Sequence, residues 1–326
     1  MGDMKKIMET WRSYEKKTLL AEQEADKGSV RLRKKGAAVL NKQLKNAAAT
    51  EVVPLVKFLN SPAGKDPKVR AALSQGTGDG KPGDEVINVK PATPVVSGMS
   101  PTQNEISLAK SIGFPLSSTE TLSNVKTGDP TGKGMKIVTA GDLVIDGHHR
   151  WSSVFSVDPG GKILAIDMQL PGDDAGSKLA VAQTAIAATM DPGAGDVPKA
   201  TTGGANDNIL GKSSEEIAEM IKGLVGTNMD SGLPLLGDKY LAAVKNSKEG
   251  ADYFGLQPNM DNNQARQTII NKVAQNLSAL PAPQGPVRDY MPQFDGGDTH
   301  KGQVKLAQVV DKMKSGEVNY KAPFEE

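Results

Sequence analysis

The period of the hydrophobic pattern changes twice in the middle of the chain, and these changes predict a strand, a helix and a second strand. Residues 143–145 are a short apolar run typical of a buried strand, and Asp146-Gly147 is a strong turn signal. Apolar residues then recur at helical spacing over residues 151–157, until Asp158-Pro159-Gly160-Gly161 ends the helix. Residues 162–170 alternate again as the second strand.

The residues before this unit are predicted to complete a small sheet. Residues 86–89 suit an edge strand, because Pro91 and Pro94 exclude a regular central strand. Ser100-Pro101 is predicted to start a helix of about ten residues with proline in its first turn. Residues 135–138 read as another strand. Together these patterns predict an α+β fold with a small mixed-sheet core.

Helical patterns prevail on both sides of this core. The chain begins with an amphipathic, lysine- and arginine-rich pattern, and further helices are predicted over residues 213–224, 237–246, 262–280 and 303–314. The Gly- and Pro-rich stretch QGTGDGKPGD is a linker by composition. We therefore predict five regions: an N-terminal helical, basic arm at 1–75, a linker at 76–85, the core domain at 86–180, a flexible loop region at 181–209, and a C-terminal helical module and tail at 210–326.

Composition limits the size of the core and the classes of partner. The 326 residues include 35 Gly and 20 Pro and are 37% hydrophobic, so one moderate core is expected. Because the net charge is only +1, any nucleic-acid binding must use a local basic patch. The absence of cysteine excludes disulfides and cysteine-ligated metals. No apolar run is long enough for a membrane span, so no membrane partner is expected.

The densest group of chemically able side chains lies where the first strand meets the helix. Two of the three histidines, His148 and His149, stand there immediately before Arg150. The first turn of a helix has unpaired amides and the positive end of the helix dipole, so an arginine and imidazoles at this point favour phosphate binding. Adjacent helical residues point about 100° apart, so only one histidine is expected to face the site squarely.

Two motifs carry a resemblance to a known family. The stretch Asp146–Trp151, DGHHRW, resembles the D-G-x-H-R box of the ParB/sulfiredoxin superfamily, which stands at the start of a helix after a strand. Upstream, Pro101–Ile106, PTQNEI, resembles the P-T-Q-x-E-I segment of phage and plasmid ParB-like domains. The resemblance covers roughly residues 86–180 and implies a ParB/sulfiredoxin-like core. Members of the superfamily bind nucleotides or DNA, and some cut DNA, hydrolyse CTP or ATP, or phosphorylate serine.

The chain departs from two branches of this family. His148 stands where sulfiredoxin has its catalytic cysteine, and the chain has no cysteine, so the sulfiredoxin reaction is excluded. Arg150 matches the second basic residue of the CTP-binding G-E-R-R box, but histidines replace its glutamate and its first arginine. This difference weakens the case for CTP hydrolysis.

Several residues are candidates for more than one role. Asp146 is interpreted either as a cap of the helix start or as a metal or water ligand. Glu105 is either a general base or metal ligand, or a capping-box partner of Ser100 or Thr102. Trp151 is predicted to pack in the hydrophobic core, and the alternative is a platform on which a base stacks. The candidate sets are: catalytic, His148, Glu105 and Asp146; phosphate or nucleotide binding, His149, Arg150, Gly147, Gln103 and Thr102; metal, Asp146 and Glu105, for Mg²⁺ or Mn²⁺, with ATP or CTP as nucleotide.

A basic run in the N-terminal arm is the candidate for contact with nucleic acid. It includes Arg31, Arg33, Lys34 and Lys35. The alternative interpretation of this run is an ordinary solvated helix.

The leading hypothesis is a phage- or plasmid-type ParB-like protein that binds the phosphate of a nucleotide or nucleic acid. Its chemistry would be metal-dependent phosphodiester hydrolysis (a nuclease) or NTP hydrolysis. The alternative is a non-enzymatic DNA-binding or virion-internal protein, and a third hypothesis is a small-molecule kinase of the serine-phosphorylating type. The expected partner is a nucleic acid or a nucleotide. Assembly into an oligomer or a virion is a further possibility, and the expected location is the host cytoplasm or the virion interior.

Overall fold

The computed structural model describes residues 74, 76, 85–172, scattered positions between 175 and 189, 206–284 and 308–318. Contacts divide the chain into two compact units. One unit is formed by Asn88–Gln169 and Thr201–Arg288, and the other by Met1–Ile87, Leu170–Ala200 and Asp289–Glu326. This division differs from the predicted boundaries, because one unit joins most of the predicted core domain to most of the predicted helical module. Nearly all of the predicted arm and linker lie outside the described residues.

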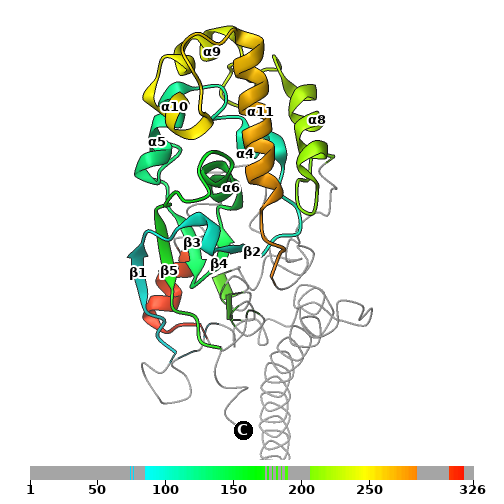
Figure 1. The fold of residues 1–326 in the computed structure, drawn as a ribbon. Coiled ribbons are helices and arrows are strands. Elements are labelled where there is room, and N and C mark those ends of the chain that lie inside the picture. Colours follow the sequence, from blue (N-terminus) through cyan, green and yellow to red (C-terminus); the bar gives the residue numbers. More distant parts are fainter. Residues whose placement is uncertain are drawn as a thin grey trace, which may run out of the picture. The chain divides into compact units, whose positions relative to one another are not determined.

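A five-stranded mixed sheet forms one side of the unit that contains the two motifs (Figure 1). Its pairs β1–β5 and β3–β4 are antiparallel, whereas β5–β3 and β4–β2 are parallel. The structure confirms the predicted α+β class and mixed sheet. In spatial order, the strands are β1 (Val89–Ala92), β5 (Ala165–Met168), β3 (Ile137–Ala140), β4 (Leu143–Asp146) and β2 (Ser100–Pro101).

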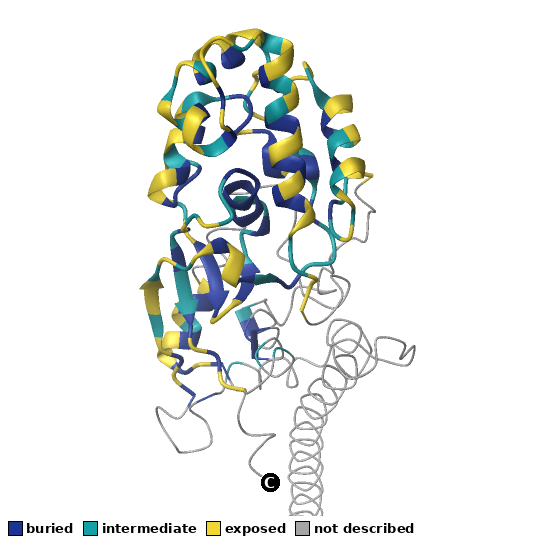
Figure 2. Cartoon of the chain, viewed as in Figure 1, coloured by how far each residue is buried: buried dark blue, intermediate teal, exposed yellow. Residues whose placement is uncertain are grey.

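The predicted unit of strand, turn, helix and strand is present as β4, α6 (His148–Val157) and β5. Helix α6 lies between the sheet and helices α4 and α11, and most of its surface is buried (Figures 1 and 2). Trp151 is fully buried; its Nε1–H donates to the carbonyl oxygen of Val96 at 2.9 Å, and its ring packs edge-on against Phe155. This burial confirms the predicted core position of Trp151.

The helix predicted from Ser100 was wrong in its start and its length. Ser100 and Pro101 form β2 instead, and the Ser100 amide donates to the carbonyl oxygen of Asp142 at 2.8 Å. Helix α4 (Leu108–Ile112) begins only after Ser107, whose hydroxyl accepts a hydrogen bond from the Lys110 amide. The edge of β4 pairs with the serine and proline and holds them extended, which a local capping rule cannot foresee. Glu105 therefore precedes the helix and is not its capping-box partner.

The remaining helices of this unit are α5 (Thr119–Asn124), α8 (Ser214–Leu224), α9 (Asp238–Lys245), α10 (Lys248–Phe254) and α11 (Asn262–Ser278), with 3-10 turns η1 (Val96–Gly98) and η2 (Val125–Thr127). Three of them confirm predicted helices. Capping boxes at Ser213 and Asp261 start α8 and α11, as their sequences favour. Helix α10 was not predicted; Gly250 lies within it, where a side chain would collide with the Val244 carbonyl.

One hydrophobic core runs through the whole of this unit. It extends from Val96 and Trp151 beside the sheet to Ile221 on α8 and Ile269 on α11. Figure 2 shows the buried sides of α8 and α11 turned toward this core and their exposed sides turned outward. Because hydrophobic contact is continuous, the helices after residue 206 are part of the same folded body as the sheet.

A buried amide links α11 to the end of α6. The Asn276 side chain is 5% exposed, and its Nδ2 donates to the carbonyl oxygens of Ser156 at 2.9 Å and Val157 at 3.3 Å. Carbonyls in the last turn of a helix have no partner within that helix, so Asn276 satisfies two of them from another helix.

The second unit is described only in short pieces. Residues 308–315 are helical, in the region of the helix predicted at 303–314. The Ile87 amide donates to the carbonyl oxygen of Met313 at 2.9 Å, and Met313 and Val318 are buried. None of the helices described in either unit has the length and apolar character needed to cross a membrane.

We expect Asn276→Ala to lower the free energy of unfolding by about 1–3 kcal/mol, because two buried carbonyls lose their hydrogen-bond donor. The control is Asn271→Ala on the exposed side of the same helix, which should change stability by less than about 0.5 kcal/mol. Urea denaturation of the two variants measures this difference. Equal effects of the two changes would contradict the proposed link between α11 and α6.

Candidate functional site

The candidate site is built on the single residue that joins β4 to α6. Gly147 adopts φ 90° and ψ 27°, a left-handed conformation that favours glycine. A Cβ atom at this position would lie 2.6 Å from Cγ2 of Ile137 and 2.8 Å from Nη2 of Arg150. Among the described residues, no side chain caps the start of α6, so its first amides are left to other partners.

His148 joins α6 to the chain that follows β2. Its side chain is buried, with 3% exposure, and its Nε2 accepts a hydrogen bond from the Thr102 amide at 3.0 Å. A backbone amide can only donate, so Nε2 carries the lone pair and the imidazole is neutral with its hydrogen on Nδ1. The acid–base role of His148 stays a prediction, and it would require Nε2 to release the Thr102 amide.

His149 makes the matching contact further along the same segment. Its Nε2 accepts from the Ser107 amide at 3.3 Å. The two imidazoles therefore hold both ends of the segment Thr102–Ser107 against the first turn of α6. Their divergence on the helix matches this arrangement, because each reaches a different end of the segment. The structure thus brings the two sequence motifs together.

Two residues that were not predicted from the sequence, Asp207 and Asn208, also hold this segment. Asn208 accepts from the Ile106 amide through Oδ1 at 2.9 Å and donates through Nδ2 to the carbonyl oxygen of Asn104 at 3.2 Å. Asp207 Oδ2 accepts from the Ser107 hydroxyl at 2.6 Å and from the Ala109 amide at 2.9 Å. Asp and Asn are typical capping and turn residues, but no local pattern indicates that their partners lie about a hundred positions earlier.

Arg150 and Asp146 form a loose ion pair beside Gly147. Arg150 Nη2 lies 3.4 Å from Asp146 Oδ2, and the side chains are 19% and 50% exposed respectively. Desolvation raises the pKa of the Asp146 carboxyl, while the Arg150 charge and the Gly147 amide act in the opposite direction. The exposure of the Asp146 side chain to water limits this shift, and such a long, half-exposed pair contributes little to stability.

Two buried side-chain atoms near the histidine turn form no hydrogen bond with the chain as the structure describes it. They are Nε of Arg150 and Oδ1 of Asn104. Buried polar atoms are nearly always paired in folded proteins, so such exceptions point to a partner outside the chain.

The remaining candidate residues lie partly in the segment Thr102–Ser107 and partly outside the described residues. Gln103 and Glu105 are half-buried within the segment Thr102–Ser107. The Thr102 hydroxyl is buried and donates to the carbonyl oxygen of Val144 at 2.6 Å, so it is already engaged. Over the described ranges, no three His, Asp or Glu side chains are grouped to hold a metal ion, and the roles of Asp146 and Glu105 as ligands stay predictions. Arg31, Arg33, Lys34 and Lys35 lie outside the described residues.

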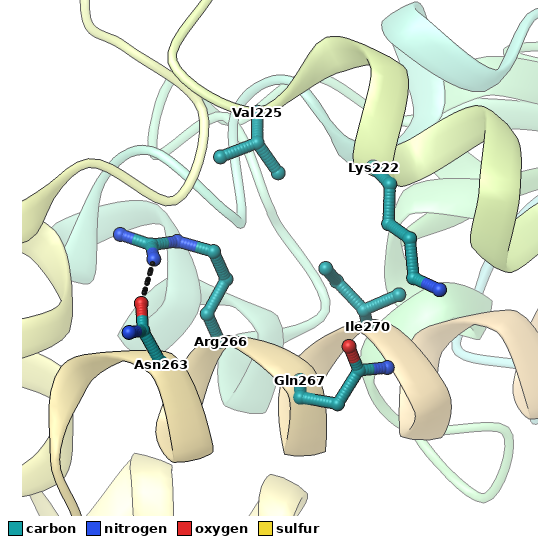
Figure 3. Close-up of a pocket in the computed structure, with 6 residues that line it drawn as sticks. All are labelled: Lys222, Val225, Asn263, Arg266, Gln267 and Ile270. Atoms are coloured by element: carbon teal, nitrogen blue, oxygen red, sulfur yellow. Dashed lines mark hydrogen bonds between the residues drawn. The ribbon is translucent and has the colours of Figure 1, made fainter.

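Two surface pockets lie away from these motifs. One, of about 290 Å³, lies between α8 and α11 and is lined by Lys222, Val225, Asn263, Arg266, Gln267 and Ile270 (Figure 3). Arg266 points toward Asn263 there, and it also donates to Asp238 at 3.0 Å, so its guanidinium serves the packing of α11. The other, of about 620 Å³, lies beside α5 and α9 and has Lys239 and Tyr240 in its lining.

Comparison with known proteins leaves the family open. No protein-family model, curated protein or solved structure matches the chain.

We expect Gly147→Ala to lower the free energy of unfolding by about 1–3 kcal/mol through its left-handed backbone alone, with a further loss from the contact with Ile137. The matched control is Gly223→Ala in α8, where a Cβ meets no atom within 4 Å. That change should raise stability by about 0.4–1 kcal/mol. Thermal denaturation of both variants measures whether stability falls or rises. An unchanged stability of Gly147→Ala would contradict the described junction between β4 and α6.

Proposed function

We propose that this protein binds the phosphate group of a nucleotide or nucleic acid at the first turn of α6. The observation that carries the proposal is Arg150 Nε, a buried donor with no hydrogen-bond partner in the described chain. It stands on the first turn of a ten-residue helix that no described side chain caps. An anion at this point would accept hydrogen bonds from the guanidinium and the first amides together.

The electrostatics of the site support a ligand with negative charge. Both imidazoles accept amide hydrogens through Nε2, so the positive charge comes from Arg150 and the helix dipole. Asp146 lies 3.4 Å from Arg150 Nη2 and is the carboxylate paired with it among the residues that the structure describes. A phosphate, with more charge and more acceptor oxygens than a carboxylate, would displace Asp146 from the guanidinium.

The resemblance to the ParB/sulfiredoxin superfamily supports the same proposal. Its two motifs, DGHHRW and PTQNEI, are joined here by the hydrogen bonds of Thr102 and Ser107 to the two histidines. A ParB-like core of phage or plasmid type is part of what we propose.

Binding without turnover is the second candidate function. The observation that favours it is that Nε2 of His148 and Nε2 of His149 both accept backbone amides, so both imidazoles help hold the segment Thr102–Ser107 in place. Hydrolysis with Mg²⁺ or Mn²⁺ that uses either histidine as a base through Nε2 would need that nitrogen to release its amide.

The decisive experiment measures binding and turnover of ATP, CTP and short single- and double-stranded DNA, with Mg²⁺, with Mn²⁺ and with EDTA. We expect Arg150→Ala to weaken phosphate binding about 10- to 100-fold, because a hydrogen bond to a charged group contributes about 1.5–3 kcal/mol. Arg150→Lys, which keeps the charge but loses Nε, should recover only part of the affinity. Lys222→Ala, which removes an exposed charge from α8, is the control. Unchanged binding by Arg150→Ala would refute the proposal, and metal-dependent turnover by the unmodified protein would favour hydrolysis over binding alone.

The Asp146–Arg150 pair predicts how binding depends on pH. Because the folded-state pKa of Asp146 is raised, its carboxylate is neutralised as pH falls through that pKa, and its competition with phosphate ends. In this interval the folded state binds more protons than the unfolded state, so the contribution of Asp146 to stability also rises as pH falls. We expect affinity for oligothymidylate in EDTA to increase toward acid pH in the unmodified protein.

The test of this dependence is Asp146→Asn, which should bind oligothymidylate more tightly at neutral pH and with a flatter pH profile. Oligothymidylate is the probe because neither its phosphodiesters nor its bases titrate in this range. If the same variant instead loses binding that depends on Mg²⁺ or Mn²⁺, Asp146 is a metal ligand and the competition model is wrong.

A further inference from the structure

The segment Thr102–Ser107 is held at both ends and from two sides. His148 and His149 accept from its first and last amides, and Asn208 bonds both the carbonyl oxygen of Asn104 and the amide of Ile106. A segment fixed by this many hydrogen bonds presents its side chains in a set geometry.

Within this fixed segment, one side-chain acceptor is left over. Oδ1 of Asn104 is buried and accepts no hydrogen bond from any residue that the structure describes, although its own main-chain carbonyl is bonded to Asn208. A buried acceptor without a donor destabilises the fold unless something outside the chain completes it. No described residue donates to this carboxamide oxygen, so a donor from outside the chain could complete it.

We propose that Asn104 is a specificity-determining residue of the phosphate site, and that its Oδ1 accepts a hydrogen bond from a donor group carried by a phosphate-bearing ligand. The inference rests on the proposed phosphate binding at α6. The donor is a sugar hydroxyl or an exocyclic amino group of a base. Phosphate itself is chiefly an acceptor, so Arg150 Nε and Asn104 Oδ1 read different parts of one ligand: the former its anion and the latter its organic portion.

This assignment predicts opposite effects on stability and on binding. Asn104→Leu keeps the size and shape of the side chain but removes the unpaired oxygen, so the melting temperature should stay the same or rise. Affinity for the nucleotide should fall about three- to tenfold, the loss of one neutral hydrogen bond. Affinity for inorganic tripolyphosphate, which lacks the organic portion, should not change. A purely structural asparagine would lower the melting temperature and leave the preference for nucleotide over tripolyphosphate intact.

The experiment is calorimetric titration of the full chain, unmodified and as Asn104→Leu, with ATP, CTP and tripolyphosphate, beside thermal denaturation of each. Asn246→Leu, an exposed asparagine at the end of α9, is the matched control and should leave all affinities unchanged. Two further probes distinguish the source of the donor. If dATP loses the effect of Asn104→Leu, the donor is the ribose 2′-hydroxyl; if purine riboside triphosphate loses it, the donor is the adenine amino group.

The outcomes separate this inference from the proposed function. Failure of the unmodified protein to bind tripolyphosphate or either nucleotide would overturn the phosphate site and the role of Asn104 with it. Binding of tripolyphosphate that Arg150→Ala removes, together with unchanged nucleotide affinity in Asn104→Leu, would overturn the role of Asn104 alone. A fall in the melting temperature of Asn104→Leu below that of the unmodified protein would also overturn it, because the residue would then be structural.

Discussion

Two backbone amides, those of Thr102 and Ser107, donate hydrogen bonds to adjacent imidazoles on α6, and the candidate site depends on this pair of contacts. They join the chain after β2 to the helix after β4, so the two motifs face one another. Both bonds require neutral imidazoles at Nε2. The histidines therefore act first as acceptors that position a segment, and the cationic character of the site comes from Arg150 and the helix terminus.

Positive and negative charges nearly cancel at the site, as they do in the whole chain, whose net charge is only +1. Arg150 is opposed by one half-exposed carboxylate, Asp146, at 3.4 Å. A loose pair of this kind keeps the guanidinium from being left alone in a partly buried position, yet holds it weakly. An incoming anion has only a small interaction to replace, which suits reversible binding.

Residues after position 206 contribute to the candidate site as well as to the core. Asp207 and Asn208 fix the segment Thr102–Ser107, and Asn276 on α11 satisfies the end of α6. Of these later residues, Asn276 bonds the end of α6 directly, while Asp207 and Asn208 reach its start through the segment Thr102–Ser107. Loss of packing around α11 would reach the site through α6, since one core joins them.

Elements whose signals are local could be predicted from the amino-acid sequence. Strand β4, the turn at Gly147, helix α6 and helices α8, α9 and α11 follow from hydrophobic period, turn residues and helix-start residues. Three other features could be seen only in the folded chain: Ser100 and Pro101 form a strand, the two histidines accept amides, and Asp207 and Asn208 hold a segment about a hundred residues earlier. The physical reason is that these outcomes depend on partners distant in sequence: a strand edge, an amide or a carbonyl can override a local preference only once the fold has brought it within hydrogen-bonding distance.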